Sequence, residues 1–267
     1  MSKTYKISSI LGILVISLMA LAACAPSSAD ASMSNPDLPV TVNTEPQNSV
    51  TLEVELTTVD EEGSTAIEAD RLEEELAQIS SGELTQEEID GLLFMREEEK
   101  LAHDVYTKLY ELWGLPIFEN IASSEQTHTQ AVLSLIIRYG LEDPAGSNEI
   151  GEFQSATLQD LYNQLISQGS QSLVDALKVG AAIEEIDILD LQENIDNTSH
   201  SDIIMVYENL MKGSRNHLRS FISTLENQTG EAYLPQHLSL EEFESIIGTQ
   251  IERGGAGNDQ SRNSNQK

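Results

Sequence analysis

The chain has little of what many protein classes depend on. Its 267 residues include a single cysteine, so the chain cannot form an internal disulfide or a metal site with several cysteine ligands. Aromatic residues make up only 5% of the sequence, and glycine and proline are also modest in number. This composition favours helices over a β-sandwich or a β-barrel.

Positive charge is also scarce. Lysine and arginine together number 14 against 45 aspartate and glutamate residues, which gives a formal net charge of -31. A surface of this sign repels phosphate backbones, so we expect no nucleic-acid partner. The same charge attracts cations, either as a diffuse atmosphere or as bound metal.

Sequence motifs for several common chemistries are missing. The chain has no glycine-rich phosphate loop, no His-Glu-x-x-His sequence and no nucleophile elbow. These absences argue against nucleotide-dependent enzymes, zinc proteases of that type and serine hydrolases.

The first 23 residues have the character of a bacterial export signal. Lys3 and Lys6 precede the apolar run "ILGILVISLMALAAC", which is too short for a convincing membrane span. The run ends in "LAAC", which resembles the lipobox of bacterial lipoproteins. The resemblance implies cleavage before Cys24, lipidation of its thiol and attachment to membrane lipid on the extracytoplasmic side of a bacterial membrane. An ordinary secretory signal with an incidental cysteine is the alternative.

Composition divides the rest of the chain into three segments. Residues 24–80 are polar and acidic and predict a flexible tether, although "TLEVELTTVD" alternates briefly like a strand. Residues 81–250 carry apolar residues at helical spacing and predict the folded domain. Residues 251–267 are low in complexity and predict a disordered tail.

Four long apolar stripes of helical period lie within residues 92–224. Thr85 and Glu88 form a capping box before the first stripe, and Gly114 ends it. Short helices are expected around "LQDLYNQLIS" and from Ser239. Two pairs of long helices joined by a long connection predict an all-α fold, a four-helix bundle with one crossover and short accessory helices.

Each stripe is interrupted near its middle by polar side chains. Burying such groups is costly unless they are paired or bound to metal, so four interruptions at similar depth predict one shared site. Glu and His three residues apart on a helix reach the same cation, and carboxylate with imidazole suits iron, manganese or zinc. The interrupting residues are Glu99, Glu125 with His128, Glu184 with Asp187, and Ser214 with His217.

Helical phase selects between neighbouring carboxylates in two of the stripes. It favours Glu99 over Glu98 and Glu184 over Glu185, and the neighbours remain as alternatives. His103 and Asp187 are possible additional metal ligands. The remaining histidines stand near expected helix starts and are interpreted as structural; they are His200 and His237.

The four motifs resemble those of the ferritin-like superfamily, in its rubrerythrin-like branch. That pattern has one Glu on each of two helices and Glu-x-x-His on each of the other two. The amino-acid sequences of the motifs also resemble those of an uncharacterised family of bacterial and archaeal ferritin-like domains, over residues 88–228. The similar sequences, from the first to the fourth helix, are "EKLAHDVY", "FENIASSEQTH", "GAAIEEIDILDL" and "YENLMKGSRNH".

The second and fourth motifs repeat one arrangement, an aromatic, Glu-Asn, an aliphatic residue and a His ten places after the aromatic. They resemble the two halves of a duplicated helical hairpin. The second copy has Ser214 where the first has Glu125, so the second metal position is expected to be weak. Asp187 or His103 would compensate; a single-metal or asymmetric site is the alternative.

The resemblance implies a lipid-anchored metal protein that performs redox chemistry with oxygen, peroxide or ferrous iron. Iron, as one or two ions, is the expected cofactor, with manganese or zinc as alternatives. Tyr106 is the expected catalytic group, and electrons would come from an external donor. A metal-binding module without turnover and a metal-free interaction module at the cell surface remain as alternatives, and a homodimer is an open possibility. The expected metal ligands are Glu99, Glu125, His128, Glu184 and His217.

Overall fold

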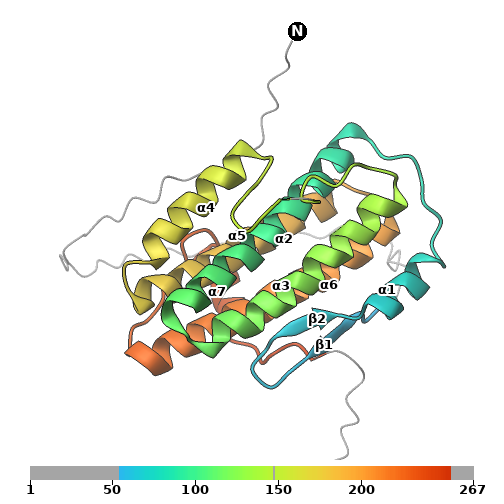
Figure 1. Cartoon of the computed structure of the whole chain (residues 1–267). Helices are drawn as coiled ribbons and strands as arrows, with labels where there is room; N and C mark the ends of the chain where they lie inside the picture. The colour runs from blue at the N-terminus through green and yellow to red at the C-terminus, as the bar shows by residue number, and fades with distance from the viewer. Residues whose placement is uncertain (1–53, 147, 254–267) are drawn as a thin grey trace, which may run out of the picture. The chain divides into compact units, whose positions relative to one another are not determined.

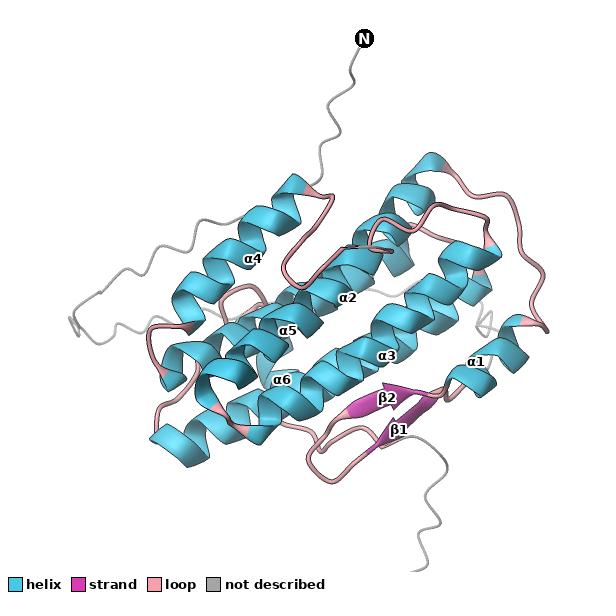
Figure 2. Ribbon diagram, in the orientation of Figure 1, coloured by secondary structure: helices cyan, strands magenta, loops and turns pink. Residues whose placement is uncertain are grey.

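The computed structural model describes residues 54–146 and 148–253, which are predominantly helical with one small sheet (Figures 1 and 2). The expected signal segment, Cys24, the first part of the tether and residues 254–267 lie outside the described residues. The elements in chain order are β1 (Thr57–Val59), β2 (Thr65–Ile67), α1 (Ala69–Leu76), α2 (Gln86–Trp113), α3 (Pro116–Arg138), α4 (Ala156–Gly169), α5 (Leu173–Asp196), α6 (Ser201–Thr229) and α7 (Leu240–Ile247).

Four long helices, α2, α3, α5 and α6, lie side by side and enclose the core (Figure 1). The pairs α2–α3 and α5–α6 share the largest interfaces, and α3 with α6 and α2 with α5 join the two pairs. The connection from α3 to α5 carries α4, which packs on α2 and α5. None of the described helices combines the length and the apolar character needed to cross a membrane.

The ends of the helices follow the local signals in the sequence. The Thr85 side chain accepts a hydrogen bond from the Glu88 backbone, and Glu88 bonds back, which confirms the predicted capping box of α2. Gly114 ends α2 with a φ of 62°, a conformation that favours glycine. Pro116 then opens α3, where its missing N–H costs nothing. Ser239 caps α7 as expected.

An aromatic cluster fills one end of the core. The Phe221 ring lies 5.2 Å from that of Tyr106 and 5.9 Å from that of Phe118, between ring centroids. All three side chains are fully buried. Gly180 of α5 leaves the space that the Phe221 ring occupies, since a Cβ there would lie 2.5 Å from a ring carbon. The close approach of α5 to α6 therefore depends on a residue without a side chain.

The structure differs from the predicted tether over residues 57–76. The strand-like alternation belongs to β1, which pairs antiparallel with β2 in a hairpin, and α1 follows. The hairpin packs on α3 and α6, and α1 packs on α3. The polar composition of this segment gave no sign of the hairpin, because the hairpin is short and side chains of the long helices bond to its backbone amides. Leu56 N–H donates to Asn209, and Ile67 N–H donates to Thr127.

We expect Gly180→Ala to lower the free energy of unfolding by up to about 2 kcal/mol. The new methyl group displaces the Phe221 ring, which costs about 1–3 kcal/mol. The roughly 1 kcal/mol that alanine gains over glycine in a helix offsets part of this cost. Urea unfolding followed by circular dichroism measures the change. Phe221→Leu makes room for the methyl group, so the double variant should lose less than the sum of the two single losses. Additive losses would contradict the clash.

Candidate metal centre

Glu125 lies between two histidines from different helices. Its Oε2 is 2.9 Å from Nδ1 of His128 on α3, and its Oε1 is 2.8 Å from Nδ1 of His217 on α6. The two imidazole rings are nearly parallel, with centroids 5.5 Å apart. All three side chains are at most 2% exposed. A single buried carboxylate thus connects two imidazoles.

Each histidine faces a second carboxylate from a further helix. Oε2 of Glu99 on α2 is 3.5 Å from His128 Nδ1, and Oε2 of Glu184 on α5 is 3.6 Å from His217 Nδ1. Two groups result, and in each the potential ligand atoms lie within 4.8 Å of one another. The structure therefore brings together all five of the metal ligands expected from the sequence, and Glu125 belongs to both groups.

Tyr106 contacts this site through Glu184. Its hydroxyl donates a 2.6 Å hydrogen bond to Glu184 Oε1 and lies 3.3 Å from the Gly180 carbonyl oxygen. Burial, and then the nearby carboxylates, raise the pKa of Tyr106 well above its usual value. The hydroxyl therefore stays protonated and acts as a donor. The expected catalytic tyrosine is placed as a group that orients Glu184.

Asp187 contacts Ser214, the residue that stands in the second motif where the first motif has Glu125. Ser214 is buried, and its hydroxyl lies within hydrogen-bonding distance of Asp187 Oδ2 and of the Leu210 carbonyl oxygen. Burial raises the pKa of Asp187 well above its usual value, and the charges of Glu99 and Glu125 raise it further. Asp187 therefore lies close enough to these carboxylates to share their environment, as its helical phase predicted.

The donor atoms of the site fit divalent cations. Glu99 Oε1 and Asp187 Oδ1 are buried without a hydrogen-bond partner among the described residues. An unsatisfied buried polar atom is costly, and a bound cation would remove that cost. With neutral imidazoles, the four carboxylates of Glu99, Glu125, Glu184 and Asp187 carry four negative charges. Two divalent cations balance that charge.

Protons balance the charge when no cation is present. Burial raises the pKa of Glu99 to about 8. Burial alone would lower the pKa of His217, but the carboxylates of Glu125 and Glu184 raise it to about 9. Although burial opposes it, the charges of His128 and His217 hold the pKa of Glu125 well below its usual range. In the metal-free site these shifts favour an ionised Glu125 and protonation of the groups around it.

The structure separates Glu185 from Glu184. Glu185 is fully buried on another side of α5 and accepts hydrogen bonds from the Tyr233 hydroxyl and from three consecutive backbone N–H groups. The backbone donors, at 2.7–2.9 Å, are those of Gln236, His237 and Leu238. Glu185 thus holds the segment between α6 and α7 and is not part of either candidate metal group.

Two other candidate ligands also lie outside the two groups. His103 is half-buried, and its Nδ1 is 2.9 Å from Asp104 Oδ1. His103 therefore does not belong to either group in which it was expected as a possible additional ligand. Glu98 is buried, and its pKa is raised well above its usual value by burial and then by Asp190, with which it shares a hydrogen bond.

Thr65 of β2 is the site residue that sequence reasoning missed. Its carbonyl oxygen accepts a 2.8 Å hydrogen bond from His128 Nε2, and its N–H donates a 3.0 Å bond to Ser124 Oγ. The same N–H lies 3.4 Å from His217 Nε2. The contacts involve the Thr65 backbone, so no side-chain pattern marks the residue in the sequence.

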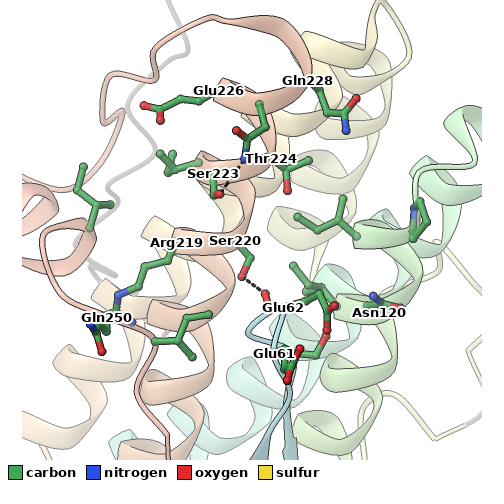
Figure 3. Close-up of a pocket in the computed structure, with 18 of the residues that line it drawn as sticks. Glu61, Glu62, Asn120, Arg219, Ser220, Ser223, Thr224, Glu226, Gln228 and Gln250 are labelled. Carbon is green, nitrogen blue, oxygen red and sulfur yellow. Dashed lines mark hydrogen bonds between the residues drawn. The ribbon is translucent and has the colours of Figure 1, made fainter.

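A groove with a volume of about 1070 Å³ opens beside the turn of this hairpin (Figure 3). Its wall includes the hairpin turn, the start of α3, the second half of α6 and the segment after α7. Ser64 and Ser220 line it, and Ser220 bonds to the Glu62 carbonyl oxygen across the turn. Since Ser64 precedes Thr65, one residue of the hairpin faces the groove and the next contacts His128.

The stability of the metal-free protein should fall as pH rises from about 4.5 to about 9. In the folded state Glu99 keeps its proton to about pH 8 and His217 to about pH 9, against usual values of 4.5 and 6.5. The folded state therefore binds more protons, and its stability is lost as pH rises through this window. Urea unfolding of chelator-treated protein at several pH values measures it. Glu99→Gln should flatten the lower part of the curve; a stability that rises with pH would contradict the assignment.

Glu185→Gln should lower the free energy of unfolding by about 2 kcal/mol, because an amide cannot accept all the hydrogen bonds that the carboxylate accepts. Chemical unfolding measures the loss. Glu241→Gln, at an exposed position of α7, is the matched control and should have little effect. Equal stability of both variants would contradict the structural role of Glu185.

Comparison with known proteins places the helical part of the chain in a family. The sequence profile of an uncharacterized protein domain, DUF2202, matches residues 88–250. The uncharacterized protein MJ0754 of Methanocaldococcus jannaschii is 53% identical over 171 residues, which cover 64% of this chain and 92% of that protein. The crystal structure of the hypothetical protein MJ0754 matches with a TM-score of 0.64 at 50% identity, over 65% of this chain and 99% of that chain. The expected relationship to an uncharacterised family with archaeal members is confirmed, and the chain belongs to the DUF2202 family.

Proposed function

We propose that this chain is a ferritin-like metal protein that holds two iron or manganese ions among its four long helices. The observation that carries the proposal is the position of Glu125, a buried carboxylate shared by two groups that each have their own histidine and their own second glutamate. A site for one ion does not need this duplication. The ligands of the proposed site are Glu99, Glu125, His128, Glu184 and His217.

The arrangement of the helices supports a ferritin-like four-helix bundle. The pairs α2–α3 and α5–α6 are joined by a long connection that carries α4, as one crossover requires. Glu99 and Glu184 come from the first helix of each pair. The second helix of each pair supplies a histidine, and α3 also supplies Glu125. This distribution follows the superfamily pattern apart from Ser214.

The chemistry we propose is redox chemistry with oxygen, peroxide or ferrous iron. A pair of iron ions at these residues would supply one-electron steps. Tyr106, held in its protonated form by burial and by the nearby carboxylates, orients Glu184 through its hydroxyl. Electrons come from an external donor in this proposal, because the chain has a single cysteine and no cysteine-ligated redox centre of its own. A lipid on Cys24 would keep the protein at the extracytoplasmic face of a bacterial membrane.

One observation favours a second candidate, a bundle that serves as an interaction module without metal. Glu125 already pairs with both imidazoles, so its own charge is balanced in the absence of a cation. Against this, two buried carboxylate oxygens near that pair, Glu99 Oε1 and Asp187 Oδ1, have no hydrogen-bond partner among the described residues. The two candidates differ in whether the protein takes up metal at all, so metal binding decides between them.

Glu125→Gln should abolish binding of one ion and weaken the other at least about a hundredfold, because it removes the charge that both positions share. Anaerobic calorimetric titration with ferrous and manganous ions measures stoichiometry and affinity. Glu185→Gln is the matched control: it changes a buried carboxylate of α5 outside the site and should bind two ions with unchanged affinity.

Absence of metal binding by the unmodified protein would overturn the metal proposal and leave the interaction module. Equal binding by Glu125→Gln would place the metal elsewhere. If two ions bind, peroxide or oxygen consumption by the loaded protein with an artificial electron donor separates an enzyme from a metal carrier. A carrier would bind both ions and show no turnover.

A further inference from the structure

The hairpin β1–β2 reaches the interior of the protein at Thr65. Thr65 is fully buried, although it belongs to a segment with many exposed polar residues. Its carbonyl oxygen is 2.8 Å from His128 Nε2. A carbonyl oxygen accepts hydrogen bonds and cannot donate them, so the proton of that bond is on Nε2. In the neutral imidazole, Nδ1 then carries the free lone pair.

That lone pair points at the candidate metal site. His128 Nδ1 is the atom that lies 2.9 Å from Glu125 and 3.5 Å from Glu99. Metal-binding histidines commonly donate their other ring N–H to a carbonyl or carboxylate, which fixes the tautomer and the orientation of the ring. Gly213 leaves the space for this orientation, since a Cβ there would lie 2.5 Å from His128 Cε1.

Side chains of α3 and α6 hold the hairpin in this position. Asn209 bonds to both sides of Glu55: its Oδ1 accepts from Leu56 N–H, and its Nδ2 donates to the Val54 carbonyl oxygen. Thr127 accepts from Ile67 N–H, at 2.8 Å. None of these bonds involves a residue of the two candidate metal groups, so the hairpin can be loosened without changing a ligand.

We propose that the β1–β2 hairpin is part of the metal centre: Thr65 is a positioning residue that fixes His128 for metal binding, so docking of the hairpin and binding of metal stabilise each other. This inference rests on the proposed function. It extends the site beyond residues 88–250, the region that the family profile covers.

The coupling works in both directions. A metal held by His128 would withdraw electron density from the imidazole and would make Nε2–H a stronger donor to the Thr65 carbonyl oxygen. By linkage, the factor by which the docked hairpin raises metal affinity equals the factor by which metal stabilises docking. The hairpin turn also forms a wall of the groove in Figure 3, so the groove borders the segment that holds His128.

Asn209→Ala in the full chain tests the coupling. It removes the two hairpin bonds two helical turns away from His217, and we expect about a tenfold loss of affinity for manganous ion. Asn194→Ala is the matched control. Like Asn209, Asn194 donates a side-chain hydrogen bond to the backbone carbonyl oxygen four residues earlier in its helix, but it has no hydrogen bond to the hairpin. It should leave the affinity unchanged. Thr127→Val, which removes a different hairpin bond, should act like Asn209→Ala.

Hydrogen exchange provides the second measurement. Metal binding should slow hydrogen exchange of the Ile67 amide in the unmodified protein. By the same linkage, the factor by which metal slows this exchange should be about tenfold smaller in Asn209→Ala. Nitrogen NMR of the metal-free protein should show His128 protonated at Nε2, and circular dichroism shows whether each variant is folded.

The outcomes separate this inference from the proposed function. If the unmodified protein binds no manganous or ferrous ion, the proposed function fails and the coupling fails with it. If metal binds, but Asn209→Ala and Thr127→Val keep full affinity and exchange at Ile67 is unaffected by metal, the coupling alone is overturned. A His128 with Nε2 unprotonated in the metal-free protein would also overturn the role of Thr65.

Discussion

The rest of the structure depends on the charge of one buried group, the Glu125 carboxylate. A carboxylate taken out of water needs positive charge around it, and Glu125 has an imidazole on each side. Those imidazoles come from α3 and α6, and the carboxylates that face them come from α2 and α5. Satisfying one group therefore ties all four long helices to the same point in the core.

Further polar residues hold the side chains around Glu125 in place. Tyr106 orients Glu184, Ser214 bonds to Asp187, and Thr65 bonds to His128. Two carboxylate oxygens at this centre, Glu99 Oε1 and Asp187 Oδ1, have no hydrogen-bond partner among the described residues. Each costs free energy while it is unsatisfied, and a bound cation would offset that cost. Their arrangement is the physical argument for a cation.

Neighbouring residues on one helix serve different purposes here. Glu184 faces the candidate metal centre, whereas Glu185, turned by about 100° around the helix, binds the backbone that leads into α7. Both carboxylates are buried, so burial alone does not identify a metal ligand. What separates them is the partner: backbone N–H groups satisfy Glu185 completely, while Glu184 faces an imidazole and the carboxylate of Glu125.

The sequence by itself determined the helices, their capped ends and the five grouped side chains. These features are local, because apolar spacing, capping boxes and the Glu125–His128 interval operate within a few residues. Only the tertiary structure decided the roles of Thr65, Glu185 and His103. Thr65 and His128 are 63 residues apart and meet through a backbone carbonyl, which every residue possesses. A contact between distant segments that uses no distinctive side chain leaves no pattern in the sequence, so only the packing of the hairpin against α3 and α6 reveals it.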